Sequence, residues 1–391
     1  MTRPKVLLIE PNPVFVVEGR LWAPRKSLEN QDLFSRRLLQ LGGSLRIGGL
    51  LVRPAAPEEL PVGYAAVEDF LSERSVIPES LTPELVRRDS PDVIWMLSIR
   101  RTSWLTKLGI PTYQMTEVPL SVRMNLARAS GGSCADLLRS AIGLRRDELL
   151  LRRRLRRAAG VEFNGVAARD AYASLNPRHL TFYDHRIYQA DLDVLSASTQ
   201  PPNTSPRLPD ARMSIAFSGR LEPFKGAQLL PEIARHLQDL TPGTVLHVLG
   251  TGALEQSIRT QAPANLVIHG FLDMDEWKQF VRDSVDIVIF PHLQGDPSCT
   301  YFEALGCGAA IGGFDNETLT PLVREHAVGW TAPRGDARGL VEHIAAVQRN
   351  PHDLITARRR AARFMANRSV EQTARQRVDH LVSCLAAVSA S

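Results

Sequence analysis

Two short segments in the second half of the chain carry residues whose types and spacing suit a negatively charged ligand. The first is "FSGRLEPFKG", residues 217–226. A strand is expected to end at Ser218, and Gly219 then allows a tight turn close to a ligand. Arg220 and Lys225 therefore lie on one loop at the carboxyl end of that strand. Two cations on one loop can bind a diphosphate and stabilise it as it departs. The alternative interpretation is a pair of surface cations that flank a turn.

The second segment is "FPHLQGDPSCTYFEALGCGAAIGG", residues 290–313. Pro297 and Ser298 are helix-start signals, so a short helix is expected to run to about Gly306. The free N–H groups of its first turn would meet phosphate or sugar oxygens, and the helix dipole would add to the attraction. Glu303, one turn deeper, would accept hydrogen bonds from a ribose diol. The alternative is that Ser298 only caps the helix and Glu303 only pairs with a surface cation.

The pairing of these two segments, about seventy residues apart, resembles the retaining glycosyltransferases of the GT-B type. It is similar above all to the large family typified by sucrose and bacterial polysaccharide synthases, the glycosyl transferases group 1. The resemblance covers roughly residues 210–340. It implies two Rossmann-like doubly wound domains that face a central cleft. It also implies a nucleotide-sugar donor held mainly by the C-terminal domain, transfer with retained anomeric configuration, and no metal or other cofactor.

The resemblance also implies roles for individual residues. Carried over position by position, Arg220 and Lys225 would bind the donor diphosphate and Glu303 the ribose hydroxyls. The "GTG" turn at 250–252 and the "HGFL" segment at 269–272 match the family's nucleobase surroundings. The predicted donor-binding residues are Gly219, Arg220, Lys225, Gly250, Gly270, Phe271, Asp296, Ser298, Cys299, Thr300 and Glu303.

Two positions depart from the family pattern. Members usually carry a second Glu eight positions before Glu303, where this chain has Gly295, with Asp296 beside it. The hypothesis is that Asp296 substitutes as the donor-sugar carboxylate. Members also place a His after a middle strand of the first domain, where "GIPTYQMTEVP" supplies Thr116 and Glu117. The predicted catalytic residues are therefore Arg220, Lys225 and Glu117, a carboxylate near the anomeric centre, with an ordinary loop Glu as the alternative.

The segment after the first strand, "EPNPVFVVEGRLWAPRKSLENQ" at 10–31, lacks the family's glycine-rich loop. A long, proline-ordered loop specific to the acceptor is expected there. Arg20, Trp22, Arg25 and Lys26 either face an anionic or flat acceptor or coat a surface loop. The residues leave both interpretations open.

The elements that must position these residues are short apolar runs between helical patterns, which indicate an α/β fold with parallel sheets. They lie at 6–9, 45–52, 92–97 and 111–115 in the first half, and at 214–219, 245–250, 266–271, 286–291 and 309–314 in the second. Residues 193–211 are rich in Pro, Ser and Thr and are interpreted as a linker. The predicted domains are an N-terminal acceptor-binding domain, 1–200, and a C-terminal nucleotide-sugar-binding domain, 211–367.

The end of the chain is predicted to be helical. Val370, Ala374, Val378 and Leu381 form one apolar stripe. A stripe so late must pack on something, and we expect the helix at about 368–391 to cross back onto the N-terminal domain.

The composition of the 391 residues, with 44% hydrophobic and 23% charged residues, is that of a soluble globular protein. A net charge of +5 favours phosphorylated ligands or an anionic membrane surface without requiring nucleic acid. The four cysteines are scattered and indicate neither a zinc site nor a disulfide framework, which fits the cytoplasm. No apolar run is long enough for a signal peptide or a membrane span.

An Arg-rich helix is expected at 144–160, with Leu144, Leu151 and Leu155 on one apolar face. It either makes peripheral contact with the inner face of the membrane or is the solvated face of a packing helix.

The function predicted from the sequence is a glycosyltransferase that moves a sugar from a nucleotide diphosphate-sugar to an acceptor hydroxyl. It would serve glycan or glycosylated-metabolite biosynthesis, and the acceptor itself is unknown. One alternative is a catalytically retired GT-B protein that binds nucleotide or a partner. Another is a nucleotide-sugar 2-epimerase, for which the sequence offers no evident acid and base residues.

Overall fold

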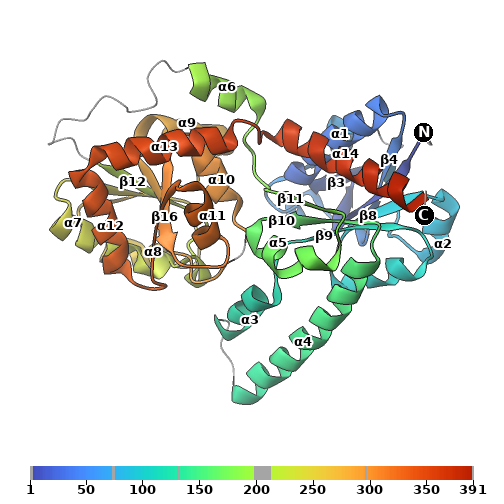
Figure 1. Cartoon of the computed structure of the whole chain (residues 1–391), viewed down its shortest axis with the longest axis horizontal. Helices are drawn as coiled ribbons and strands as arrows, with labels where there is room; N and C mark the ends of the chain where they lie inside the picture. The colour runs from blue at the N-terminus through green and yellow to red at the C-terminus, as the bar shows by residue number, and fades with distance from the viewer. Residues whose placement is uncertain (1–2, 73–74, 130–132, 198–212, 296, 390–391) are drawn as a thin grey trace. The chain divides into compact units, whose positions relative to one another are not determined.

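The computed structural model describes residues 3–72, 75–129, 133–197, 213–295 and 297–389, which form two compact α/β units (Figure 1). The first unit comprises residues 1–120, 138–182 and 370–391. The second comprises residues 121–137 and 183–369. None of the helices within the described ranges is both long enough and apolar enough to span a bilayer.

The first unit is built on a parallel sheet whose strands are mostly short runs of buried apolar residues. In sheet order the strands are β11 (His179–Phe182), β10 (Gly160–Asn164), β9 (Thr112–Thr116), β8 (Val93–Leu97), β1 (Lys5–Glu10), β4 (Ser44–Gly49) and β7 (Val76–Ile77). The order reverses between β1 and β8, where Leu7 pairs with Ile94. This is the doubly wound arrangement, whose ligands gather at the carboxyl ends of the strands near such a reversal.

Helices pack against this sheet, and their apolar side chains form the hydrophobic core together with those of the strands. They are α1 (Arg25–Gln40), α2 (Pro83–Asp89), α4 (Cys134–Arg157), α5 (Val166–Tyr172) and α14 (Val370–Ser389). The predicted apolar face of the Arg-rich helix is part of this core, because Leu151 and Leu155 pack against Phe163 and Tyr172. Two of the three residues of the predicted apolar face therefore pack inside the unit, and contact of this helix with a membrane stays a prediction.

A small second sheet replaces the long loop predicted after the first strand. Its order is β5 (Val52–Pro54), β2 (Val14–Val17), β3 (Arg20–Pro24) and β6 (Tyr64–Ala66). Strands β2 and β3 form a hairpin in which Val17 pairs with Arg20. Glu18 and Gly19 both have positive φ, 52° and 80°, as a two-residue type I′ turn requires. The prediction of a proline-ordered loop was wrong because the prolines bound the strands instead.

The C-terminal helix α14 packs on the first unit, beside α1 (Figure 1). The predicted stripe is buried, since Ala374, Val378 and Leu381 belong to the core that contains Trp95. Polar contacts also hold this helix. Arg37 of α1 makes a double hydrogen bond to Asp379, with N···O distances of 2.7 and 3.0 Å.

The second unit has its own parallel sheet with the same reversal of order. The strands are β14 (Leu266–Gly270), β13 (Val245–Leu249), β12 (Ser214–Ser218), β15 (Ile287–Phe290), β16 (Ala310–Phe314) and β17 (Gly329–Ala332). The order 3-2-1-4-5-6 is that of a Rossmann fold, with the switch point between β12 and β15. The helices of this unit are α3 (Leu120–Ala129), α6 (Gln189–Ala197), α7 (Leu230–Leu240), α8 (Glu255–Gln261), α9 (Met274–Ser284), α10 (Cys299–Gly306), α11 (Leu319–His326), α12 (Ala337–Arg349) and α13 (Pro351–Met365).

The two units divide the chain earlier than the predicted linker. Residues 183–197, including α6, cluster with the second unit. The reason is packing, because Ile187 and Leu192 are buried in the core formed by Phe290 and Phe302. Most of the predicted linker, residues 198–211, lies outside the described part of the chain.

Candidate functional site

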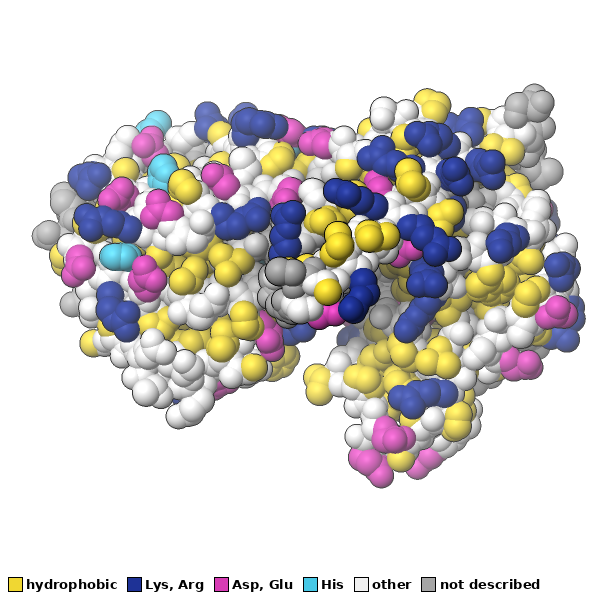
Figure 2. Space-filling view, turned by 90° about the horizontal axis from the view of Figure 1, so that it is seen from below, with side chains coloured by type: hydrophobic (Ala, Val, Ile, Leu, Met, Phe, Trp, Pro, Cys, Tyr) yellow, Lys and Arg dark blue, Asp and Glu magenta, His cyan; other side chains and the backbone are white. Residues whose placement is uncertain are grey.

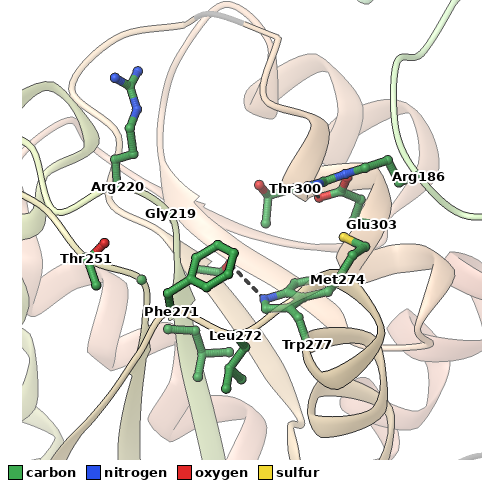
Figure 3. A pocket seen from close by; sticks show the side chains of 13 residues that line it. Arg186, Gly219, Arg220, Thr251, Phe271, Leu272, Met274, Trp277, Thr300 and Glu303 are labelled. Carbon is green, nitrogen blue, oxygen red and sulfur yellow. Dashed lines mark hydrogen bonds and ion pairs between the residues drawn. The ribbon is translucent and has the colours of Figure 1, made fainter. Parts of the chain in front are cut away.

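A cavity of about 300 Å³ opens at the carboxyl edge of the second unit's sheet (Figure 3). The ends of β12, β13 and β14 and the loops that follow them form one side, and helices α9 and α10 and the segment before α6 contribute the rest. The lining residues are Arg186, Ser218, Gly219, Arg220, Leu249, Gly250, Thr251, Phe271, Leu272, Met274, Trp277, Thr300 and Glu303. This position, next to the switch point, is where α/β sheets of this order bind ligands.

Backbone hydrogen bonds join the three loops on the strand side. The N–H of Gly219 donates to Leu249 at 3.0 Å, and the N–H of Gly250 donates to Gly270 at 2.7 Å. Gly250 has φ +139°, and a Cβ there would lie 2.1 Å from the carbonyl oxygen of Gly219. Only glycine lets the two loops approach this closely, so the cavity wall is a rigid backbone surface.

The two segments singled out in the sequence meet at the switch point. Gly226 ends "FSGRLEPFKG" with φ +70°, and a Cβ there would lie 1.8 Å from the carbonyl oxygen of Pro291. The N–H of Leu293 donates to the carbonyl of Phe224 at 3.1 Å. The loops after β12 and β15 are therefore in direct backbone contact.

The two predicted cations lie near one aromatic ring. The guanidinium carbon of Arg220 is 5.2 Å, and Nζ of Lys225 is 5.7 Å, from the ring centroid of Phe224. Arg220 lines the cavity, on the opposite side from Glu303 (Figure 3). Lys225 is buried and is not among the lining residues. Burial and the charge of Lys225 lower the pKa of His292 well below its ordinary value.

Helix α10 brings Thr300 and Glu303 to the cavity (Figure 3). Ser298 takes the N-cap position, and its side chain makes no capping hydrogen bond. Ser298 and Cys299 are not among the lining residues, and Sγ of Cys299 lies 3.5 Å from Oδ2 of Asp184. Asp296, the predicted substitute carboxylate, lies outside the described residues.

Glu303 is held by an arginine that the sequence analysis did not identify. Nε of Arg186 donates to Oε1 of Glu303 at 2.9 Å, and a second guanidinium nitrogen lies 3.5 Å from Oε2. The carboxylate side chain is 2% exposed and the guanidinium side chain 41%. Burial is the largest single influence and opposes the charge on Arg186, but the charge and hydrogen bond of Glu303, together with Asp184 and Cys299, raise the pKa of Arg186. The pair fixes the orientation of the carboxylate.

The remaining wall of the cavity is apolar. Phe271, Leu272, Met274 and Trp277 line it, and Phe271 is 71% exposed. Nε1 of Trp277 donates to Oγ of Ser218 at 2.8 Å, the dashed contact in Figure 3. Gly270, also predicted to bind the donor, has φ +79° and is not among the lining residues.

Several lining residues have little or no local sequence signal. Arg186 precedes α6 and reaches Glu303 from 117 positions away. Trp277 is better marked, because Asp273 and Glu276 form a capping box that predicts the start of α9 just before it.

The predicted catalytic residue Glu117 belongs to the first unit. It follows β9, and Nδ2 of Asn164, at the end of β10, donates to Oε2 of Glu117 at 3.1 Å. The candidate acceptor residues of the hairpin contact their own unit. Arg20 pairs with Glu68 and lies over Trp22 with 5.9 Å to the ring centroid, and Arg25 lies 5.8 Å over Phe70. Across the described residues no group of three or more His, Cys, Asp and Glu is placed to hold a metal.

Comparison with known proteins shows which family of sequences the second unit matches. Residues 204–365 match the sequence model of the family Glycosyl transferases group 1. These residues are a glycosyl transferases group 1 domain. The matched range contains both segments that meet at the switch point, and all lining residues except Arg186 lie within it.

Two curated relatives match part of the chain. The amylovoran biosynthesis glycosyltransferase AmsK of Erwinia amylovora is 25% identical over 42% of this chain and 44% of its own length. The putative colanic acid biosynthesis glycosyltransferase WcaL of Escherichia coli K12 is 25% identical over 36% of this chain and 37% of its own length. The chain therefore spans less than half of each relative it matches.

Solved structures match the group 1 domain and the first unit together. HepE of Anabaena in complex with UDP aligns with a TM-score of 0.59 at 15% identity, over 97% of this chain and 99% of that one. Sucrose-phosphate synthase of Thermosynechococcus elongatus aligns with a TM-score of 0.63 at 12% identity, over 98% and 100%. The chain has the GT-B fold, with a Rossmann-like sheet in each unit.

Proposed function

We propose that this protein is a glycosyltransferase that moves a sugar from a nucleotide diphosphate-sugar to an acceptor hydroxyl, with retained anomeric configuration. The observation that carries the proposal is the shared cavity of Arg220 and Glu303 at the switch point of a glycosyl transferases group 1 domain. The curated relatives are named for the biosynthesis of amylovoran and colanic acid, so glycan biosynthesis is the pathway class that we propose.

Each wall of the cavity suits one part of the donor. The apolar wall with the exposed ring of Phe271 suits a flat nucleobase. The carboxylate of Glu303, held by Arg186, suits the two hydroxyls of a ribose. Arg220 and the first turn of α10 suit the diphosphate. The HepE structures hold UDP or UDP-glucose, which supports a ligand of this chemical class here.

Catalysis would come from charge stabilisation at the leaving group. As the bond from the anomeric carbon to the diphosphate breaks, negative charge develops on the departing oxygen. Arg220 is already positioned beside Phe224, and the buried charge of Lys225 lies near the same ring, so little reorganisation is needed. We propose that these cations act without a metal ion. Activity that survives EDTA would support this, and activity that requires added Mg²⁺ or Mn²⁺ would contradict it.

We further propose Glu317 as the donor-sugar carboxylate that the family pattern places at the position of Gly295. A Cβ on Gly295 would lie 2.2 Å from Oε2 of Glu317, so the carboxylate of Glu317 occupies the space where a longer side chain at 295 would begin. Nδ2 of Asn125 donates to Oε1 of Glu317 at 2.9 Å, and Arg334 lies 3.4 Å from Oε2. Glu317→Gln should retain nucleotide binding and lose sugar transfer. Asp296→Asn is the competing variant, and loss of transfer there alone would favour Asp296.

The proposal includes peripheral contact with a membrane through α4. Glu117 remains a predicted catalytic residue. Asn164 donates a hydrogen bond to its carboxylate, and Glu117 lies in the segment where members of the family carry a His.

The test is a thermal-shift panel of UDP, GDP, ADP and dTDP, followed by a search for transfer products with the matching nucleotide-sugars. A ligand at a hundred times its Kd adds about 2.7 kcal/mol of stability. Arg220→Ala and Glu303→Ala should abolish the shift, whereas Arg235→Ala, an exposed arginine of α7, should keep it. If no nucleotide stabilises the protein, the proposal is wrong.

The same panel and transfer assay distinguish the glycosyltransferase from the second candidate, a protein that binds nucleotide but has lost catalytic activity. This alternative is favoured by Gly295, which leaves the family's first carboxylate position without a side chain. It predicts a full thermal shift with no transfer and no hydrolysis of any nucleotide-sugar.

A further inference from the structure

Helix α4 carries a second apolar stripe on the side away from its unit's core. Leu138, Ile142 and Leu149 are 63%, 60% and 62% exposed. At about 100° per residue these three side chains fall within roughly 40° of one another around the helix. Leu151 and Leu155, which pack in the core, lie on the other side. The exposed stripe therefore has no role in the packing that holds α4 on the first unit.

Arginines surround this stripe. Arg145, Arg146, Arg153 and Arg156 are exposed and lie on the same side of the helix as the three apolar residues. Figure 2, which faces the end toward which α4 points in Figure 1, shows Lys and Arg gathered around hydrophobic side chains in this region.

The acidic residues of α4 do not neutralise these arginines. Glu148 is buried, where it accepts hydrogen bonds from Arg152 at 2.6 Å and from the hydroxyl of Tyr172 at 2.9 Å. Asp136 accepts from Ser133 at the start of the helix. Asp147 lies on the side of the helix away from the stripe. The exposed stripe is thus apolar along its centre, flanked by Arg145, Arg146 and Arg153, and continued at its C-terminal end by Arg156.

We infer that this stripe docks on a bilayer that contains anionic phospholipid. An amphipathic helix with Leu and Ile at the centre and Arg at the borders can bury its apolar side chains at the acyl boundary while the guanidinium groups meet lipid phosphates. A second copy of this chain is a poorer partner, because it would bring like charges together. The inference deepens the membrane contact in the proposed function by naming the face and the lipid charge, and it concerns a surface separate from the donor cavity.

The test is co-flotation of the full chain with vesicles, without any nucleotide present. The protein should float with phosphatidylcholine vesicles that contain phosphatidylglycerol and stay unbound with phosphatidylcholine alone. Added salt should weaken the binding, because the arginines are exposed and their attraction is screened. A charge-reversed double variant, Arg145→Glu with Arg146→Glu, should bind at least about tenfold more weakly. A triple variant, Leu138→Gln, Ile142→Gln and Leu149→Gln, should lose binding as well.

Matched controls separate docking from general effects of charge and exposed apolar area. Arg359→Glu with Arg360→Glu changes two adjacent exposed arginines of α13 and should leave binding unchanged. Leu39→Gln changes a leucine of α1 that is 64% exposed and should also leave it unchanged. Equal binding to both vesicle types, or equal loss in the controls, would overturn the inference. So would sedimentation that shows a dimer abolished by the triple variant while vesicles do not bind.

Failure here is distinguishable from failure of the proposed function. The nucleotide thermal shift reports on the cavity alone and should be the same for the triple variant and the unchanged chain.

Discussion

The two units share one strand order, but the loops at their switch points differ. In the second unit, β12 is followed by Gly219 and Arg220, and the loop lines a cavity. In the first unit, β1 ends at Glu10, which is buried and accepts hydrogen bonds from Asn12 at 2.8 Å and Gln31 at 2.9 Å. Burial raises the pKa of Glu10 in spite of these bonds. The same topology therefore places a cavity-lining loop at the switch point of one unit and a buried carboxylate with hydrogen bonds from its own unit at that of the other.

Both units also contain a buried arginine–carboxylate pair in which α13 or α14 supplies the arginine. Arg377 makes two hydrogen bonds to Glu162 in the first unit, at 2.9 and 2.6 Å. Arg358 lies 3.5 Å from Asp286 in the second. The first pair is the better hydrogen-bonded, and it connects β10 to a helix from the far end of the chain.

The largest predicted effect follows from breaking the first pair. Arg377→Met should lower the free energy of unfolding of the first unit by about 3–5 kcal/mol, because the buried Glu162 carboxylate would lose its cationic partner and keep only the hydrogen bond from Trp95. Urea denaturation followed by tryptophan fluorescence measures this change, in a variant whose tryptophans other than Trp95 are replaced by Phe, since Trp95 donates to Glu162 at 2.6 Å. Arg36→Met, at an exposed pair with Asp32, should cost less than about 1 kcal/mol. Equal losses would remove the distinction between the two pairs.

The next effect tests the interlocked loops of the second unit. Gly226→Ala should cost about 1–2 kcal/mol for the left-handed backbone and more for the contact with Pro291. Gly335→Ala carries a similar φ of +83° with nothing within 4 Å, so it should show the backbone cost alone. Thermal denaturation compares the two. If Gly226→Ala is no worse than Gly335→Ala, the close approach does not restrain the loop.

A smaller effect concerns the apolar wall of the cavity. Phe271→Ala should weaken nucleotide binding by about 1–3 kcal/mol, since stacking on an aromatic ring contributes that much per base. The loss should be similar for every base, because stacking does not read base edges. Isothermal titration with the nucleotide that binds best measures it, and Val267→Ala, 40% exposed on β14, is the control. Unchanged affinity would remove Phe271 from the site.

The smallest effect is a pH dependence in the second unit. Burial and the neighbouring His269 lower the pKa of His247 to about 4, from an unfolded value of 6.5. As the pH falls, His247 is protonated in the unfolded chain before it is protonated in the folded chain. The contribution of neutral His247 to the free energy of unfolding is therefore fully present above pH 6.5 and is lost as the pH drops toward 4. Because His247 is partly exposed, the loss should be only about 1 kcal/mol. His247→Gln should flatten the stability profile between pH 6.5 and 4, as thermal denaturation at several pH values would show.

The sequence predicted most strands that are continuous apolar runs, such as β12, β13 and β15, because strands of a sheet covered on both faces read that way. It missed β10, whose sequence contains Glu162 and Asn164. Glu162 is fully buried, and its charge is paired with that of Arg377, 215 positions away. The hairpin β2–β3 was also missed, since its turn uses Glu18 where Asn or Asp would signal the type I′ geometry.

The residues of the candidate site could be predicted where their positions depend only on neighbours in the sequence. Arg220, Thr300 and Glu303 follow from loops and a helix start that can be located in the sequence, and all three line the cavity. Arg186 was not predictable, because its pairing with Glu303 depends on how residues 183–187 cross the second unit. Lys225 was predicted from its place on the loop and from the family resemblance, neither of which shows that its side chain is buried.

The position of α14 has a consequence for synthesis on the ribosome. The first unit holds the earliest residues of the chain, yet its core lacks Ala374, Val378 and Leu381 until α14 has emerged. At about 5–20 residues per second, residues 1–182 would wait roughly 10–40 s for that helix. The second unit, by contrast, is complete once residue 369 is available. The unit that contains β1 is therefore completed after the second unit, and its sheet lacks the cover of α14 during that interval.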